Sequence, residues 1–206
     1  MLPILIKGFG TMLVVIDPVG LVPIYLALVG NYPRRERLRI AVGGGLTAAA
    51  VLTLFAITGT TILDHLGISI HAFRIAGGLL LSKIAIDMIF TQRKRRSDEE
   101  KEEDPDRDSP AVFPLGIPLM AGPGAIATVV ILREDLGGGS TGVLWTLACI
   151  AAVISITTTS MLLAGAFANK LGQTGINIVT RLLGMLLAAL SVQFVADGIR
   201  AISTLP

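Results

Sequence analysis

The sequence predicts an all-α membrane protein: six transmembrane helices as two inverted three-helix repeats, with helices 1 and 4 broken. Three observations lead to this prediction: long apolar stretches, a short repeat shared by the two halves, and a matched pair of proline breaks. Apolar residues make up 52% of the chain and charged residues only 16%, against about 25% charged residues in an average soluble domain. A soluble fold of this length leaves much of its chain facing water, so it could not shield this many apolar side chains, whereas a bilayer could.

Six stretches approach the length of about 20 predominantly apolar residues that a helix needs to cross a bilayer. The third stretch is the shortest and carries Lys83 and Asp87, and the sixth carries Arg181 and Asp197 near its two ends. The first carries only Asp17, and the other three carry no charge. The six stretches are residues 8–29, 40–63, 75–90, 112–132, 142–168 and 176–199.

Charged residues gather between the third and fourth stretches, where positions 93–108 hold six basic and eight acidic residues. Such a composition is typical of a flexible linker, because it buries too little apolar surface to order itself. We therefore divide the chain into a first three-helix repeat (1–91), a charged linker (92–111) and a second three-helix repeat (112–206). Basic residues concentrate in cytoplasmic loops, and they follow the first and third stretches here. We expect a multi-pass protein of the cell (inner) membrane with a cytoplasmic linker and both termini outside.

The repeat is visible as a match between GISIHAFRIAG at positions 67–77 and GINIVTRLLG at positions 175–184, with a single-residue gap. Each segment opens the third apolar stretch of its half. Because each half has an odd number of crossings, the second half enters the membrane from the opposite side. Inverted repeats of this kind are typical of secondary transporters, whose substrates bind near the bilayer midplane at broken helices.

The matched breaks are Asp17-Pro18 in the first stretch and Gly122-Pro123 in the fourth. Each pair resembles an N-cap residue followed by a proline at the first helical position, so a new half-helix begins at each break. The start of a helix presents unpaired N–H groups and the positive end of its dipole, which favour an anion. Because Asp17 has no acidic counterpart at Gly122, a substrate with one cationic and one anionic end, such as an amino acid, would suit the pair. The predicted substrate-binding residues are Asp17, Pro18, Gly20, Gly122, Pro123 and Gly124.

The alternative interpretation is that Asp17 only caps its helix and that the breaks only aid packing. Five further residues are predicted to have supporting roles. Arg74 and Arg181 are expected to neutralise a helix C-terminus or an aspartate, or to anchor the helix at the membrane interface. These structural roles are favoured over substrate binding. Lys83 and Asp87 are four residues apart and can form a buried ion pair, with an ion or proton relay as the alternative. These supporting residues are Pro23, Arg74, Arg181, Lys83 and Asp87.

Four segments resemble the MarC family of bacterial and archaeal integral membrane proteins. They are Asp-Pro-Val-Gly-Leu-Val-Pro at 17–23, Phe-Arg-Ile-Ala-Gly-Gly at 73–78, Pro-Leu-Met-Ala-Gly-Pro-Gly-Ala at 118–125 and Arg-Leu-Leu-Gly at 181–184. The resemblance covers almost the whole chain and implies a six-span fold related to amino-acid exporters. It further implies, from some members, transport of small neutral amino acids such as glycine and alanine, driven by the proton gradient. In the family the position of Asp17 can be Asn, which favours polar binding over proton transfer there.

The predicted function is secondary transport of a small solute, with the lipid bilayer, the substrate and a coupling proton as partners. A passive channel for a small neutral solute is the first alternative, because paired half-helices also occur in pores. An intramembrane enzyme is disfavoured, since the apolar stretches contain neither a Gly-x-Ser-x-Gly motif nor a cluster of metal ligands. No catalytic residue, metal or cofactor is predicted. Nucleic-acid binding is disfavoured because the basic cluster is followed at once by acidic residues.

Overall fold

The computed structural model describes residues 2–30, 32–90 and 110–203, and the regular structure within these ranges is entirely helical. Most of the charged linker, residues 91–109, therefore lies outside the described residues. The helices are α1 (Leu2–Ile16), α2 (Pro18–Val29), α3 (Arg34–His65), α4 (Ile70–Ile89), η1 (Ala111–Met120), α6 (Pro123–Asp135), α7 (Gly139–Leu162) and α8 (Ala164–Ser203). The irregular helix η1 has extended backbone at Phe113 and Ile117, each of which precedes a proline and is thereby driven out of the helical region.

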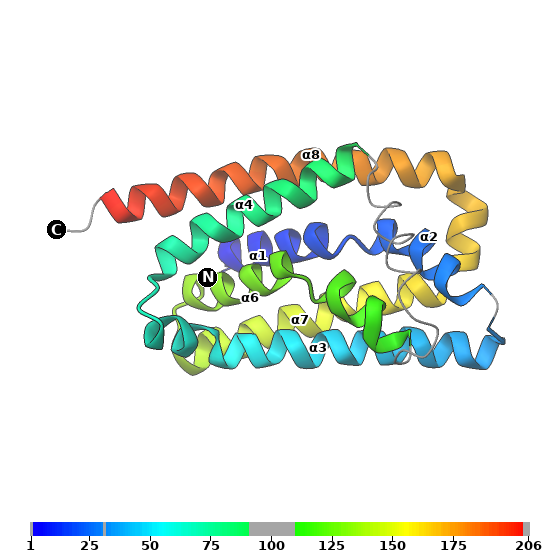
Figure 1. The fold of residues 1–206 in the computed structure, drawn as a ribbon, viewed down its shortest axis with the longest axis horizontal. Coiled ribbons are helices and arrows are strands. Elements are labelled where there is room, and N and C mark those ends of the chain that lie inside the picture. Colours follow the sequence, from blue (N-terminus) through cyan, green and yellow to red (C-terminus); the bar gives the residue numbers. More distant parts are fainter. Residues whose placement is uncertain (1, 31, 91–109, 204–206) are drawn as a thin grey trace.

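The helices form an elongated bundle in which the chain reverses direction from one long segment to the next (Figure 1). The pair α1–α2 runs in one direction, α3 returns and α4 runs out again. The pair η1–α6 then runs back, α7 runs out and α8 returns. Both termini consequently lie at the same end of the bundle, which we call the termini end. The α2–α3 turn and the α7–α8 junction lie at the opposite end.

Several of these helices are long and apolar enough to cross a membrane, as the sequence predicts. Within the described residues they are Leu2–Val29, Arg34–His65, Gly139–Leu162 and Thr174–Ser203. The pair η1 and α6 adds a fifth if it is taken as one span with a bend of 57°. The predicted span at 75–90 coincides with α4 up to Ile89. Helix α4 is not among these candidates and carries Arg74, Lys83 and Asp87. Six crossings therefore stay a prediction.

The centre of the bundle is built from the broken helices. Consecutive residues of α6, from Ala127 to Leu132, are all buried, and α2 buries Leu21, Val22 and Ile24. A helix that is buried on all sides is typical of the interior of a bundle. The helices α3, α4, α7 and α8 instead each present large exposed apolar side chains, among them Leu46, Leu79, Leu144 and Leu182. These surfaces are suited to contact lipid rather than water.

Glycines allow α4 and α8 to approach each other closely along their length (Figure 1). A Cβ atom added to Gly78 would lie 2.8 Å from the carbonyl oxygen of Ser191. On the other side of the same interface, a Cβ atom on Gly198 would lie 2.6 Å from Cγ1 of Ile75. Close helix contact through small residues is the usual way in which membrane helices pack. Gly78 and Gly198 thus let α4 and α8 pack closely.

The glycine contact gives a testable prediction about stability. We expect Gly78→Ala to destabilise the protein by about 1–3 kcal/mol, because the new methyl group forces α4 and α8 apart. This corresponds to a fall of about 2–4 °C per kcal/mol in the melting temperature of a protein of this size, measured on the purified protein in detergent. Gly10→Ala is the matched control, since no atom lies within 4 Å of the Cβ position. Equal melting temperatures for the two variants would show that this contact does not hold the helices together.

Candidate functional site

Asp17 forms the first break between α1 and α2. Its backbone is left-handed (φ 50°, ψ 71°), and it is the one non-glycine residue with positive φ in the described part of the chain. Aspartate and asparagine adopt this conformation more readily than most residues. The side-chain Oδ1 accepts a hydrogen bond of 2.9 Å from the backbone N–H of Gly20, and Pro18 occupies the first helical position. The predicted N-cap is therefore confirmed.

The first break is narrow and fully buried. The backbone N–H of Asp17 still donates to the carbonyl of Leu13, and its carbonyl already accepts from the N–H of Leu21, both at 3.0 Å. Helical hydrogen bonding thus ends and resumes at the same residue. Asp17 has no exposed surface. A carboxylate at this depth in a membrane protein is costly and is retained where it has a function.

Gly122 forms the second break, between η1 and α6. It is the N-cap of α6 with an extended backbone (φ −78°, ψ 170°), no side chain to cap the helix, and Pro123 at the first helical position. A Cβ atom at this position would lie only 2.6 Å from the carbonyl oxygen of Pro118. The local fold therefore admits glycine and excludes an acidic side chain, which explains why the two breaks differ in charge.

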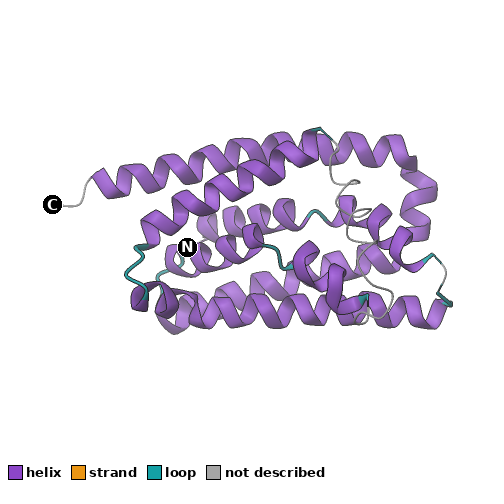
Figure 2. Ribbon diagram, viewed as in Figure 1, coloured by secondary structure: helices purple, strands orange, loops and turns teal. Residues whose placement is uncertain are grey.

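The packing of α1 against α6 brings the two breaks together. Near the termini end, a Cβ atom on Gly8 would fall within the side chain of Leu132. Further along, a Cβ atom on Gly124 would lie 3.5 Å from Cγ1 of Val15. Helices α1 and α6 are therefore antiparallel in a nearly constant register. Asp17 follows Val15 by two residues and Gly122 precedes Gly124 by two, so the same register brings Asp17 to the level of Gly122. Both breaks interrupt their helices within the length of the bundle (Figure 2).

The surroundings of the two breaks are unequal. Asp17, Pro18, Gly20 and Gly124 are buried, whereas Gly122 is half-buried and Pro123 is exposed. Gly124 also packs against α4, because a Cβ atom there would lie 2.7 Å from Cδ1 of Ile84. The first break thus supplies a buried carboxylate, and the second supplies an uncharged helix start with an open side. The two breaks therefore differ in charge and in burial.

The supporting residues predicted from sequence divide between different places. Pro23 is half-buried within α2, Asp87 is half-buried on α4, and Arg181 is exposed on α8. Lys83 is exposed, so its predicted burial is wrong, because the side chain points to the outside of the bundle. Its pairing with Asp87 stays a prediction.

Arg74 lies away from the breaks and pairs with Asp135, the last residue of α6. It is seven or more residues along α4 from Leu81 and Ile84, the side chains beside Gly124, which is about 10 Å or more at 1.5 Å per residue. The side chain thus neutralises an aspartate at a helix C-terminus. This is the structural role that the sequence favours for it.

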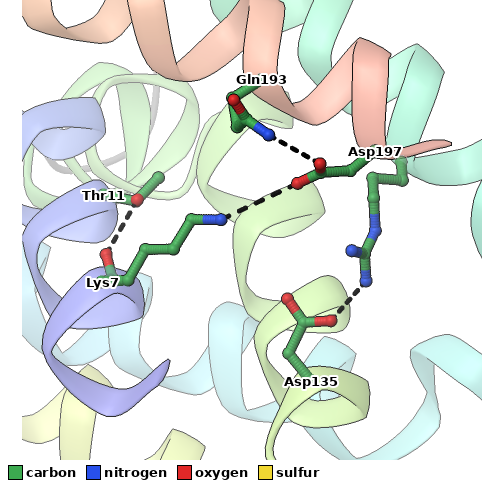
Figure 3. A network of polar contacts seen from close by, with 6 residues as sticks. Lys7, Thr11, Asp135, Gln193 and Asp197 are labelled. Carbon is green, nitrogen blue, oxygen red and sulfur yellow. Dashed lines mark hydrogen bonds and ion pairs between the residues drawn. The ribbon is translucent and has the colours of Figure 1, made fainter. Parts of the chain in front are cut away.

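A cluster of charged side chains at the termini end is the main feature that the sequence does not reveal (Figure 3). Lys7 Nζ lies 3.9 Å from Asp197 Oδ2, and Gln193 donates a hydrogen bond of 2.6 Å to the other carboxylate oxygen of Asp197. Arg74 and Asp135 form the second pair of the cluster. The sequence shows charges near the ends of apolar stretches but gives no indication of which ones meet.

A small cavity of about 20 Å³ lies beside this cluster, between α1 and α6, and has room for roughly one water molecule. Its polar lining comes from both helices. The lining residues are Ile4, Lys7, Gly8, Thr11, Thr128, Ile131, Leu132, Asp135 and Phe194. Among the described residues, no group of three or more His, Cys, Asp or Glu side chains is placed to hold a metal ion.

Comparison with known proteins places the chain among membrane proteins. A UPF0056 membrane protein of Methanocaldococcus jannaschii is 35% identical over 196 residues, which cover 95% of this chain and 95% of that protein. A UPF0056 membrane protein of Aquifex aeolicus is 37% identical over 199 residues, covering 95% and 92%. The UPF0056 membrane protein YhcE of Escherichia coli is 34% identical over 203 residues, covering 97% and 94%. No solved structure matches the chain.

The names of these relatives state a membrane location and no activity. The family model described as MarC family integral membrane protein matches residues 2–203, which include both breaks and the charged linker. The resemblance found in the four sequence segments is thus confirmed over nearly the whole chain. The chain belongs to the MarC family of integral membrane proteins.

Proposed function

We propose that this protein is a secondary transporter of small solutes, most specifically small neutral amino acids such as glycine and alanine. The observation that carries the proposal is the antiparallel packing of α1 against α6, which brings the starts of α2 and α6 to one level. Paired helix breaks of this kind form the substrate sites of many secondary transporters. The proposed site consists of Asp17, Pro18, Gly20, Gly122, Pro123 and Gly124.

The two helix starts suit opposite ends of an amino acid. The Asp17 carboxylate would bind the ammonium group of the substrate, because an opposite charge compensates the cost of burying either ion alone. The start of α6 has no acidic side chain, so the positive end of its dipole can favour the substrate carboxylate.

Two features of the fold support six crossings in two inverted repeats. The long segments alternate in direction, and the segments of the second half run opposite to their counterparts in the first (Figure 1). Packing partners are also exchanged between the halves. Helix α2 packs against α7 and α8 of the other half, and its counterpart α6 packs against α3 and α4. We further propose that the protein lies in the cell inner membrane with the termini end outside and the linker in the cytoplasm.

Uptake into proteoliposomes tests the function. We expect saturable accumulation of radiolabelled alanine or glycine that depends on an imposed pH gradient, because a coupled transporter concentrates its substrate. Liposomes without protein give the background, and the Gly10→Ala variant is a matched protein control, since no atom lies within 4 Å of a Cβ atom added there. Equilibration without accumulation would indicate a passive channel. No uptake above background by folded protein would exclude these amino acids as substrates.

Substitutions of Asp17 separate its charge from its role as a cap. Asp17→Asn keeps both the left-handed backbone and the capping group, so we expect an unchanged melting temperature. Asp17→Ala loses the cap, at a cost of about 1 kcal/mol, and forces alanine into a left-handed conformation, at about 1–2 kcal/mol more. Asp17→Gly loses the cap alone and should lie between the two. The measurement is thermal unfolding in detergent.

The same series tests substrate binding. A hydrogen bond to a charged group contributes about 1.5–3 kcal/mol, so Asp17→Asn should weaken apparent affinity for alanine about tenfold or more without lowering stability. The quantity to measure is the concentration dependence of uptake in proteoliposomes. Wild-type uptake by the Asn variant, together with loss of stability in the Ala variant, would mean that Asp17 only caps α2.

A further inference from the structure

Two ion pairs close the termini end of the bundle, and each joins one half of the chain to the other. Lys7 of α1 faces Asp197 of α8, and Arg74 of α4 pairs with Asp135 of α6 (Figure 3). Lys7 also lies over the ring of Phe194, with Nζ 5.9 Å from the ring centre. We call Lys7, Arg74, Asp135 and Asp197 the end cluster. The cluster therefore connects four helices from both halves at a single level.

The partners in the end cluster depend on one another. Asp135 is the last residue of α6, where the negative end of the helix dipole disfavours a carboxylate, so Arg74 is needed to compensate it. Arg74 is only partly satisfied in return, because its buried Nε donor has no hydrogen-bond partner. A buried donor without a partner costs free energy. The arrangement at Arg74 is therefore held chiefly by charge attraction to Asp135.

The cavity beneath the cluster lies on the seam that leads to the proposed substrate site. It is lined by Lys7 and Asp135, one member of each pair, and by the hydroxyl-bearing Thr11 and Thr128. Each hydroxyl donates to the carbonyl four residues earlier in its own helix, at 2.9 Å for Thr11 and 2.8 Å for Thr128. In both cases the oxygen keeps the capacity to accept a hydrogen bond. Thr11 is six residues from Asp17, about 9 Å along the helix.

We propose that the end cluster is a gate, which closes access from the termini end to the paired breaks and opens when its two ion pairs separate. This proposal rests on the proposed transport function for its purpose. The four charged side chains hold α1 and α6 to α8 and α4. The small cavity, in which Thr11 and Thr128 stand among mainly apolar side chains, is the closed remnant of the passage. Because every pair joins the two halves, a relative movement of the halves breaks both pairs together.

Access to Thr11 tests the gate without reference to transport. The probe is Thr11→Cys in a Cys149→Ser background, since Thr11 lines the cavity and is 2% exposed. The labelling rate is measured with a cationic and an anionic membrane-impermeant methanethiosulfonate. Opening accelerates both reagents, whereas a change in local charge alone moves the two rates in opposite directions. Leu66→Cys, in an exposed position after α3, shows whether the reagent reaches the termini end of the bundle. This control is tested in intact cells and in inside-out vesicles. Labelling of Thr11→Cys is then measured in the preparation in which Leu66→Cys is labelled.

Breaking the cluster should accelerate labelling of Thr11→Cys. We expect about a two- to fivefold increase for Asp135→Asn or Asp197→Asn, the range for one part-exposed ion pair, and a larger increase for both together. The exchanged pair Arg74→Asp with Asp135→Arg should restore slow labelling. Asp64→Asn, on an exposed carboxylate of α3, is the matched control and should have no effect.

Two outcomes would overturn the gate. Unchanged labelling in the double variant would show that the end cluster does not control access. Faster labelling that the exchanged pair does not reverse, or that Asp64→Asn also produces, would indicate general loosening of the bundle. Uptake of alanine is measured separately. If the labelling results support the gate but no alanine is taken up, only the proposed substrate is rejected.

Discussion

The antiparallel contact between α1 and α6 is the interaction on which the rest of the structure depends. Gly8 and Gly124 lie at its two ends: the side chain of Leu132 occupies the space of the Cβ atom that Gly8 lacks, and Val15 lies in van der Waals contact with Gly124. The register of the two helices sets the relative height of the residues that they carry. It brings Asp17 level with Gly122, and it places Lys7 and Asp135 around one small cavity. Since membrane helices gain little from apolar burial alone, such close contact is the main source of their affinity.

The two breaks show how a repeated architecture can hold unequal chemistry. Both start a helix with an N-cap residue followed by proline, but the backbone conformation at the N-cap differs between them. At the first break the chain turns through a left-handed Asp17, whose side chain replaces the missing hydrogen bond to Gly20. At the second, the chain passes so close to the carbonyl of Pro118 that only glycine fits. The backbone geometry at Gly122 therefore accounts for the difference in charge between the breaks.

Local features of the fold could be predicted from the sequence, whereas pairwise features could not. The apolar stretches and both N-caps follow from composition and from the chemistry of proline. Four stretches, and a fifth if η1 and α6 form one bent span, coincide with helices suited to cross a membrane, and both N-caps are found at the predicted residues. The third stretch is predicted from its apolar residues, yet Lys83 is exposed and α4 carries three charged residues, Arg74, Lys83 and Asp87. The end cluster could not be predicted from the sequence for another reason. Arg74 and Asp135 are 61 residues apart, and no local pattern reports which distant charges a tertiary register brings together.

The position of the end cluster on the α1–α6 seam constrains how a transport cycle could work. If α1 and α6 separated along their full length, the level of Asp17 relative to Gly122 would be lost, and with it the proposed binding geometry. An opening movement must therefore preserve the contact between Val15 and Gly124 and loosen the seam only toward the termini end. The end cluster is suited to control this movement, because its ion pairs join α1 to α8 and α6 to α4. Breaking them frees the ends of the two central helices without removing the glycine contact near the breaks. In the proposed cycle, close packing at the centre and charge attraction at the end thus have separate roles: the first maintains the proposed site and the second controls access to it.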